Sequence, residues 1–124
     1  MLVLKDSSVI HDGLSPEMYY ALGVAAAIKY RLFGLNCVVT ALLDGRHNQG
    51  SLHPLGLAAD LRARDLRDDE AISWYEAVKQ ELDHMGFDVV WEGGVGATPA
   101  TTGAHVHIEF QPKPGEHFWH TLGG

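Results

Sequence analysis

The chain has 124 residues, a single cysteine and a formal net charge of −7. This length fits one domain over residues 1–124 that can bury a core without disulfides, and one cysteine excludes a disulfide within the chain. The acidic charge argues against nucleic-acid binding, which needs clustered lysine and arginine, and no stretch approaches the roughly 20 apolar residues that span a bilayer.

The first predicted elements are a short strand or extended arm within residues 1–14 and an amphipathic helix after it. Ser15 is a suitable N-cap, Pro16 suits the first helical position, and Gly34 ends the helix. The expected core face contains the apolar residues that recur at three- and four-residue steps. These are Tyr19, Leu22, Ala26, Tyr30 and Phe33.

The run at 36–43 is apolar and β-branched, which predicts a central strand with Cys37 as a buried structural thiol. A second helix is predicted further along, capped by Asp65 or Asp68 and ended by Gly86. Its expected apolar stripe is Ala71, Ile72, Tyr75, Val78, Leu82 and Met85.

Three further strands are predicted at 57–61, 87–91 and 104–110. The chain therefore combines two main helices with several short strands.

Two stretches carry candidate metal ligands: residues 51–60, which contain His53 and Asp60, and the later His105-Val106-His107. Side chains alternate along a strand, so both imidazoles would share one face and Asp60 would face away from its apolar neighbours. Two neighbouring strands could then bring these groups together. Imidazole and carboxylate are ligands that zinc accepts, and three of them leave a fourth position open, as in catalytic sites.

The first stretch has the pattern Ser-x-His-x-x-Gly-x-Ala-x-Asp, with its fixed positions at Ser51, His53, Gly56, Ala58 and Asp60. Together with the later His-x-His it resembles the zinc metallopeptidases of the D-alanyl-D-alanine carboxypeptidase and L-alanyl-D-glutamate endopeptidase family, which includes phage cell-wall endopeptidases. The resemblance covers residues 46–110. It implies an α+β domain with two main helices and a small, mostly antiparallel sheet, like the fold of these peptidases and of Hedgehog signalling domains.

The resemblance also implies site residues. The zinc ligands of the family correspond to His53, Asp60 and His107. A glutamate closely precedes the final metal-binding histidine in related sequences, which makes Glu92 the candidate general base, although residues 93–103 lengthen the separation here. The first histidine of His-x-His helps to polarise the substrate or to stabilise the transition state, a role that falls to His105. If Glu92 lies too far from the metal, His105 is the remaining candidate base.

Arg46 and Ser51 are the candidate substrate-binding residues. Peptides cleaved by carboxypeptidases end in a carboxylate, which a guanidinium binds in bidentate fashion. A loop arginine in water or paired with Asp44 is an equally good interpretation of Arg46.

The resemblance thus implies a zinc-dependent hydrolase of peptide bonds in peptidoglycan stem peptides, of the phage or prophage endolysin type. The alternative is a virion-associated structural or binding module that keeps the fold and the zinc with little or no catalysis. Hedgehog-type domains resemble these peptidases in their zinc ligands without being known for peptidase action, so zinc ligands alone do not establish turnover.

Residues 1–6 lack a basic segment followed by a sustained apolar one, so no signal peptide is predicted. We therefore expect synthesis in the cytoplasm and action at the cell wall after lysis or within a virion. Peptidoglycan peptide and other virion or tail proteins are the expected partners, and neither nucleic acid nor membrane is expected to be one.

Overall fold

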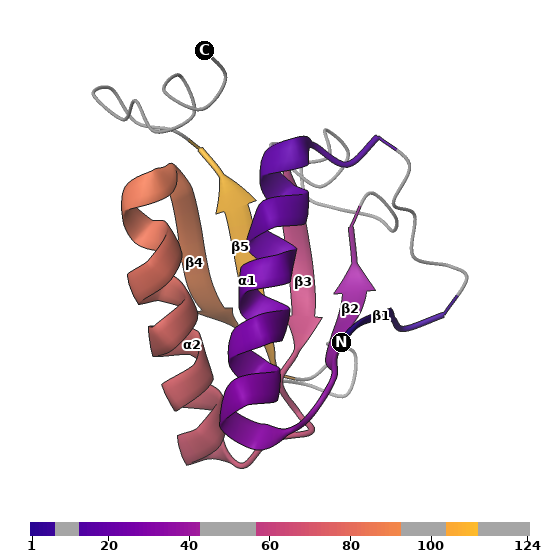
Figure 1. Cartoon of the computed structure of the whole chain (residues 1–124), viewed down its shortest axis with the longest axis vertical. Helices are drawn as coiled ribbons and strands as arrows, with labels where there is room; N and C mark the ends of the chain where they lie inside the picture. Colours follow the sequence, from indigo (N-terminus) through magenta and orange to yellow (C-terminus); the bar gives the residue numbers. More distant parts are fainter. Residues whose placement is uncertain (7–12, 43–56, 93–103, 112–124) are drawn as a thin grey trace.

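Figure 1 shows a sheet with two α-helices packed on one of its faces. The computed structural model describes residues 1–6, 13–42, 57–92 and 104–111. Along the chain the elements are β1 (Leu2–Leu4), α1 (Pro16–Phe33), β2 (Cys37–Ala41), β3 (Ala58–Arg62), α2 (Asp68–Leu82), the 3-10 helix η2 (Asp83–Met85), β4 (Phe87–Glu92) and β5 (His105–Phe110). Within these residues no helix has the length and hydrophobicity needed to cross a bilayer.

The strands of the described residues form one five-stranded sheet in the order β1-β2-β3-β5-β4. β1 runs parallel to β2, and every other neighbouring pair is antiparallel. The predicted α+β class, with two main helices and a mostly antiparallel sheet, is confirmed.

Helix α1 begins and ends where the sequence predicts, for local reasons. The Ser15 hydroxyl accepts a hydrogen bond from the Met18 N–H at 3.2 Å, and Pro16 stands in the first turn, where its missing N–H has no helical partner to lose. Gly34 ends the helix with a φ of 68°, and its N–H donates to the Tyr30 carbonyl at 2.8 Å.

The core face of α1 differs from the predicted one. Tyr19 and Tyr30 were expected in the core, yet their residues are 51% and 60% exposed. A tyrosine keeps its hydroxyl hydrated at the surface, whereas small side chains let a helix lie close to its neighbours. The buried residues are accordingly mostly small or unbranched: Met18, Ala21, Leu22, Ala25, Ala26, Ile28 and Lys29.

Helix α2 follows Arg67, and neither Asp65 nor Asp68 is its N-cap. The Arg67 backbone N–H donates to the Glu70 carboxylate at 2.9 Å, which satisfies an amide that the first turn leaves free. The predicted stripe is wrong at Ile72, which is exposed. The buried residues of α2 are Ala71, Trp74, Val78 and Leu82.

A buried ion pair joins α1 to the segment between β3 and α2. The ammonium of Lys29, which is fully buried, donates to both carboxylate oxygens of Asp65 at 2.9 and 2.8 Å and to the Arg62 carbonyl at 3.2 Å. It also lies 4.8 Å from the centre of the Trp74 ring, and the indole N–H of that ring donates to the Ala25 carbonyl at 3.0 Å. These contacts compensate the burial of a charge and hold the backbone that leaves β3.

The strands place polar side chains on the sheet face turned away from the helices, which we call the outer face. Side chains alternate along a strand, so each strand divides into two sets. One set, which includes Ala59, Leu61, Val106 and Ile108, packs into the core beneath the helices. The other set includes Asp60, Arg62, His105 and His107.

Cys37 is fully buried, as predicted for a structural thiol. Burial raises the pKa of its thiol to about 12. Since the thiolate is the nucleophilic form, this cysteine stays neutral and unreactive near neutral pH.

The buried ion pair predicts an asymmetry between its two partners. Asp65→Asn leaves the Lys29 charge buried without its counter-ion and should lower the free energy of unfolding by about 2 kcal/mol. Lys29→Met keeps the packing of the aliphatic stem, and the Asp65 carboxylate it leaves behind is 31% exposed and can be hydrated, so it should cost less. Urea unfolding of both variants measures the difference. Asp69→Asn, at an exposed acid in the first turn of α2, serves as control, and equal losses in the two partner variants would contradict the prediction.

Candidate metal centre

The outer face carries two rows of polar side chains that run across the strands. In one row Glu92 on β4 pairs with His105 on β5, which pairs with Arg62 on β3. In the next row His107 pairs with Asp60. Directly opposed residues of antiparallel strands lie about 4.5–5.5 Å apart, so three strands bring their polar groups into one small area.

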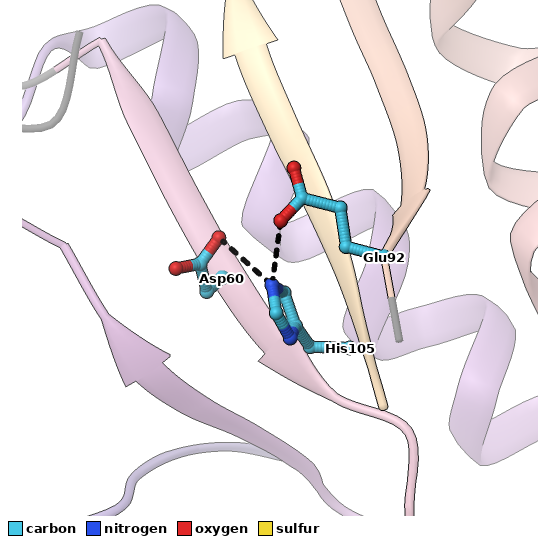
Figure 2. Close-up of side chains that lie close together, drawn as sticks. All are labelled: Asp60, Glu92 and His105. Carbon is cyan, nitrogen blue, oxygen red and sulfur yellow. Dashed lines mark hydrogen bonds and ion pairs between the residues drawn. The ribbon is translucent and has the colours of Figure 1, made fainter. Parts of the chain in front are cut away.

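Asp60, Glu92 and His105 meet at the centre of this area (Figure 2). Each offers one ligand atom, and these atoms all lie within 4.8 Å of one another. The Nε2 atom of His105 lies 2.9 Å from a Glu92 carboxylate oxygen and 3.8 Å from Asp60 Oδ1. We call these three residues the metal cluster, because they are close enough to hold a metal ion.

The donor set of the metal cluster narrows the class of ion that it could hold. Two carboxylates and one imidazole are a mixed oxygen and nitrogen set, which suits zinc and other first-row transition metals. Calcium and magnesium prefer oxygen ligands throughout, so the imidazole makes them a poorer fit. The chemistry of the residues is therefore compatible with zinc without selecting it over its neighbours in the series.

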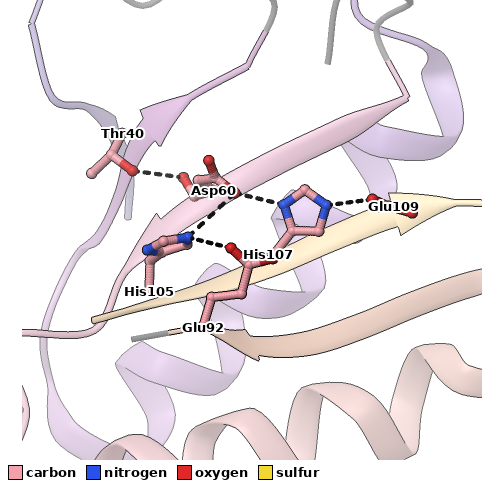
Figure 3. Close-up of polar contacts among 6 residues, drawn as sticks. All are labelled: Thr40, Asp60, Glu92, His105, His107 and Glu109. Atoms are coloured by element: carbon pink, nitrogen blue, oxygen red, sulfur yellow. Dashed lines mark hydrogen bonds and ion pairs between the residues drawn. The ribbon is translucent and has the colours of Figure 1, made fainter. Parts of the chain in front are cut away.

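His107 is held beside the metal cluster by two carboxylates (Figure 3). Its Nδ1 lies 2.6 Å from Asp60 Oδ1, and its Nε2 lies 2.7 Å from a Glu109 oxygen. Burial alone would lower the pKa of this imidazole, but the hydrogen bonds to Asp60 and Glu109 and the charges of Asp60 and Glu92 outweigh it and raise the pKa to about 9. With no metal bound, the imidazolium therefore donates both of its N–H groups to carboxylates.

Asp60 is the residue that connects these contacts. Figure 3 shows its carboxylate between the rings of His105 and His107, at the middle of β3. On the side of β2, the Thr40 hydroxyl donates to the Asp60 backbone carbonyl at 3.3 Å. Because β3 is paired on both sides, the backbone that carries this carboxylate is fixed by its neighbours.

The structure brings four of the predicted site residues together. Asp60 on β3 faces His107 on β5, and His105 lies on the same face. Glu92 is in contact with His105 in spite of its distance along the chain, because the last residue of β4 pairs with the first residue of β5. Residues 93–103 therefore lengthen the sequence between Glu92 and His105 without separating them in space.

The remaining predicted residues, His53, Arg46 and Ser51, lie outside the residues that the structure describes. The geometry adds Arg62 and Thr40, which sequence reasoning did not select. Arg62 could have been found from its position two residues after Asp60, since residues at that spacing share one face of a strand. Nothing in the sequence points to Thr40, whose contact depends on how β2 pairs with β3.

Comparison with known proteins leaves the resemblance to zinc peptidases without independent support: no protein-family model matches the chain, and no curated protein matches it.

The raised pKa of His107 predicts how the stability of the metal-free protein depends on pH. The imidazolium is favoured in the folded state, so its stabilisation is fully present below pH 6.5 and is lost as the pH rises towards 9. After discounting for solvent, we expect a loss of about 2 kcal/mol over this window. His107→Gln cannot titrate there, so the stability difference between the two chelator-treated proteins should shrink from pH 6.5 to 9. Urea unfolding at each pH measures it, and a constant difference would contradict the assignment.

Proposed function

We propose that this chain is a zinc-dependent peptidase that hydrolyses peptide bonds in peptidoglycan stem peptides. The observation that carries the proposal is the convergence of Asp60, Glu92, His105 and His107 on one sheet face. His107 Nδ1 lies 2.6 Å from Asp60 Oδ1, and His105 Nε2 lies 2.9 Å from Glu92 Oε2. The motif of residues 51–60 and its resemblance to peptidases supply the substrate class. In this proposal the protein is of phage or prophage type and acts at the cell wall after lysis or within a virion.

In the proposed site Asp60 and His107 bind zinc together with His53. The position of Asp60 and His107 on one sheet face favours joint binding of an ion. Both are carried by paired strands, and neither side chain has to move far to reach the same metal ion. Bound zinc would act as a Lewis acid on the scissile carbonyl and bring the pKa of water towards neutrality. His107 must give up a proton to become a ligand. Its hydrogen bonds to Asp60 and Glu109 favour the protonated ring, so a bound metal ion would have to take the place of that proton.

Glu92 is proposed to accept the proton of the attacking water and to return it to the leaving amine. Its residue is exposed and stands at the end of β4, so its carboxylate can reach solvent and substrate. The Nε2–H of His105 donates to this carboxylate at 2.9 Å and so holds it close to Asp60. His105 is then also placed to stabilise the negative charge that develops on the scissile carbonyl.

A second function is favoured by one specific observation. Glu92 lies within ligand distance of Asp60 and His105, so the same carboxylate that could act as a base could instead bind the ion. A site that used Glu92 in addition to the peptidase ligands would have four protein ligands and no open position, which is the arrangement of structural zinc sites. The chain would then be a virion-associated structural or binding module with little or no catalysis.

The decisive measurement is mass spectrometry of purified stem peptides after incubation with the zinc-loaded protein. The peptidase predicts two fragments whose masses add up to that of the substrate plus one water, and these masses locate the bond. Intact peptides together with about one tightly bound zinc per chain would support the structural module instead.

Glu92→Gln separates the two roles of this residue. If Glu92 is the general base, the variant should keep zinc and lose roughly 10²- to 10⁴-fold in kcat. If Glu92 is instead a zinc ligand, the affinity of the variant for zinc should fall. Glu81→Gln, the same substitution at an exposed position of α2, is the matched control and should change neither quantity. Full activity in Glu92→Gln would remove this residue from the mechanism.

A further inference from the structure

A pocket of about 140 Å³ lies on the β3 side of the metal cluster, and its lining is rich in positive charge. The lining residues are Lys5, Thr40, Arg62 and Arg64, and we call this the cationic pocket. Three of the nine lysine and arginine residues of a chain with net charge −7 gather there. The pocket is smaller than the roughly 300–1,000 Å³ of pockets for drug-sized ligands, so it suits one small anionic group.

The cationic pocket and the metal cluster share strand β3. Arg62 pairs directly with His105 of the cluster, and it follows Asp60 by two residues on the same face. Two residues of strand span about 7 Å. Thr40, on β2, belongs to both sites: it lines the pocket, and its hydroxyl donates to the Asp60 backbone carbonyl. The cationic pocket therefore lies next to the metal cluster on the outer face.

Arg62 has hydrogen-bonding capacity that the described residues do not use. Its Nε atom is buried, and among these residues it has no hydrogen-bond partner. A buried donor without an acceptor is unfavourable, so the hydrogen bonding of Arg62 is incomplete among the described residues. A guanidinium presents its donors in a planar fork that matches a carboxylate. The backbone of Arg62 is held in place, because its carbonyl accepts from Lys29.

We propose that the cationic pocket binds a carboxylate of the peptide whose scissile bond lies at the metal cluster. This inference rests on the proposed peptidase function and adds its substrate specificity. An extended peptide advances about 3.3–3.6 Å per residue, so the carboxylate would lie within about two residues of the scissile bond. The group can be the C-terminal carboxylate of the peptide or the free carboxylate of an internal glutamate.

Two pairs of peptides test the proposal and distinguish these sources. The first pair is acetyl-D-alanyl-D-alanine and its C-terminal amide. The second is a stem peptide with a free carboxylate on its internal D-glutamate and the same peptide with that group amidated. Each is titrated into ¹⁵N-labelled full-length protein, metal-free and zinc-loaded, while NMR follows the Arg62 Nε–H resonance. One acid should bind roughly tenfold more tightly than its amide and shift this resonance.

Variants separate the pocket from the overall charge of the protein. Arg62→Gln should abolish the preference for acid over amide, and Arg64→Gln, at an exposed residue that is safe for folding, should reduce it. Arg31→Gln, at an exposed arginine in the last turn of α1, is the matched control and should leave the preference unchanged. Equal binding of acid and amide in both pairs would overturn the proposal, as would a preference that survives Arg62→Gln or an Arg62 resonance that responds only to inorganic phosphate.

Failure of this inference and failure of the proposed function give different results. Preference for the acid without any hydrolysis would keep the carboxylate pocket and remove the peptidase. Hydrolysis with equal kcat/KM for acid and amide would keep the peptidase and remove the pocket. If both hold, Arg62→Gln should raise KM for the acid with little change in kcat, because the carboxylate contact is equally present in ground state and transition state.

Discussion

The arrangement of the outer face depends on the register between β3 and β5. Asp60 faces His107 and Arg62 faces His105 only in this register. A shift by one residue would turn every side chain of one strand to the opposite face, so that Asp60 would enter the core while Leu61 would face water. The apolar set that includes Leu61, Val106 and Ile108 prevents this shift, since those residues pack beneath the helices. Core packing thus determines where the candidate ligands meet.

The limits of helix α1 and the two faces of strands β3 and β5 could be predicted from the sequence, because both follow from local chain geometry. The limits of α1 follow from Ser15, Pro16 and Gly34, and the faces of β3 and β5 follow from alternation along a strand. The core face of α1 could not be predicted by size, since Tyr19 and Tyr30 remain at the surface while Lys29 is buried. Burial of that lysine depends on Asp65, a partner from another part of the chain.

The residues of the site also divide into those that a local pattern predicts and those that depend on long-range pairing. Asp60, His105 and His107 were predicted as neighbours because period-two alternation places their side chains on one face. The contact of Glu92 with His105 depends on β4 pairing with β5, and sequence spacing alone argued against it. The cationic pocket could not be predicted at all, since it joins Lys5 near the N-terminus to residues of β2 and β3 and of the segment after β3. Long-range pairing of strands, which no local pattern encodes, brings the residues of this pocket together.

Metal binding by the three residues of the metal cluster would affect the stability of the sheet. Its three residues come from β3, β4 and β5, and 31 and 12 residues of chain lie between them along the sequence, as counted from positions 60, 92 and 105. An ion held by all three would cross-link these strands and close two loops of the polypeptide, which removes entropy from the unfolded chain in the way a disulfide does. With only one cysteine, the chain cannot form such a bridge covalently within itself. Coordination by all three residues would therefore cross-link this small sheet where no internal disulfide can, and the bound ion would stabilise the fold.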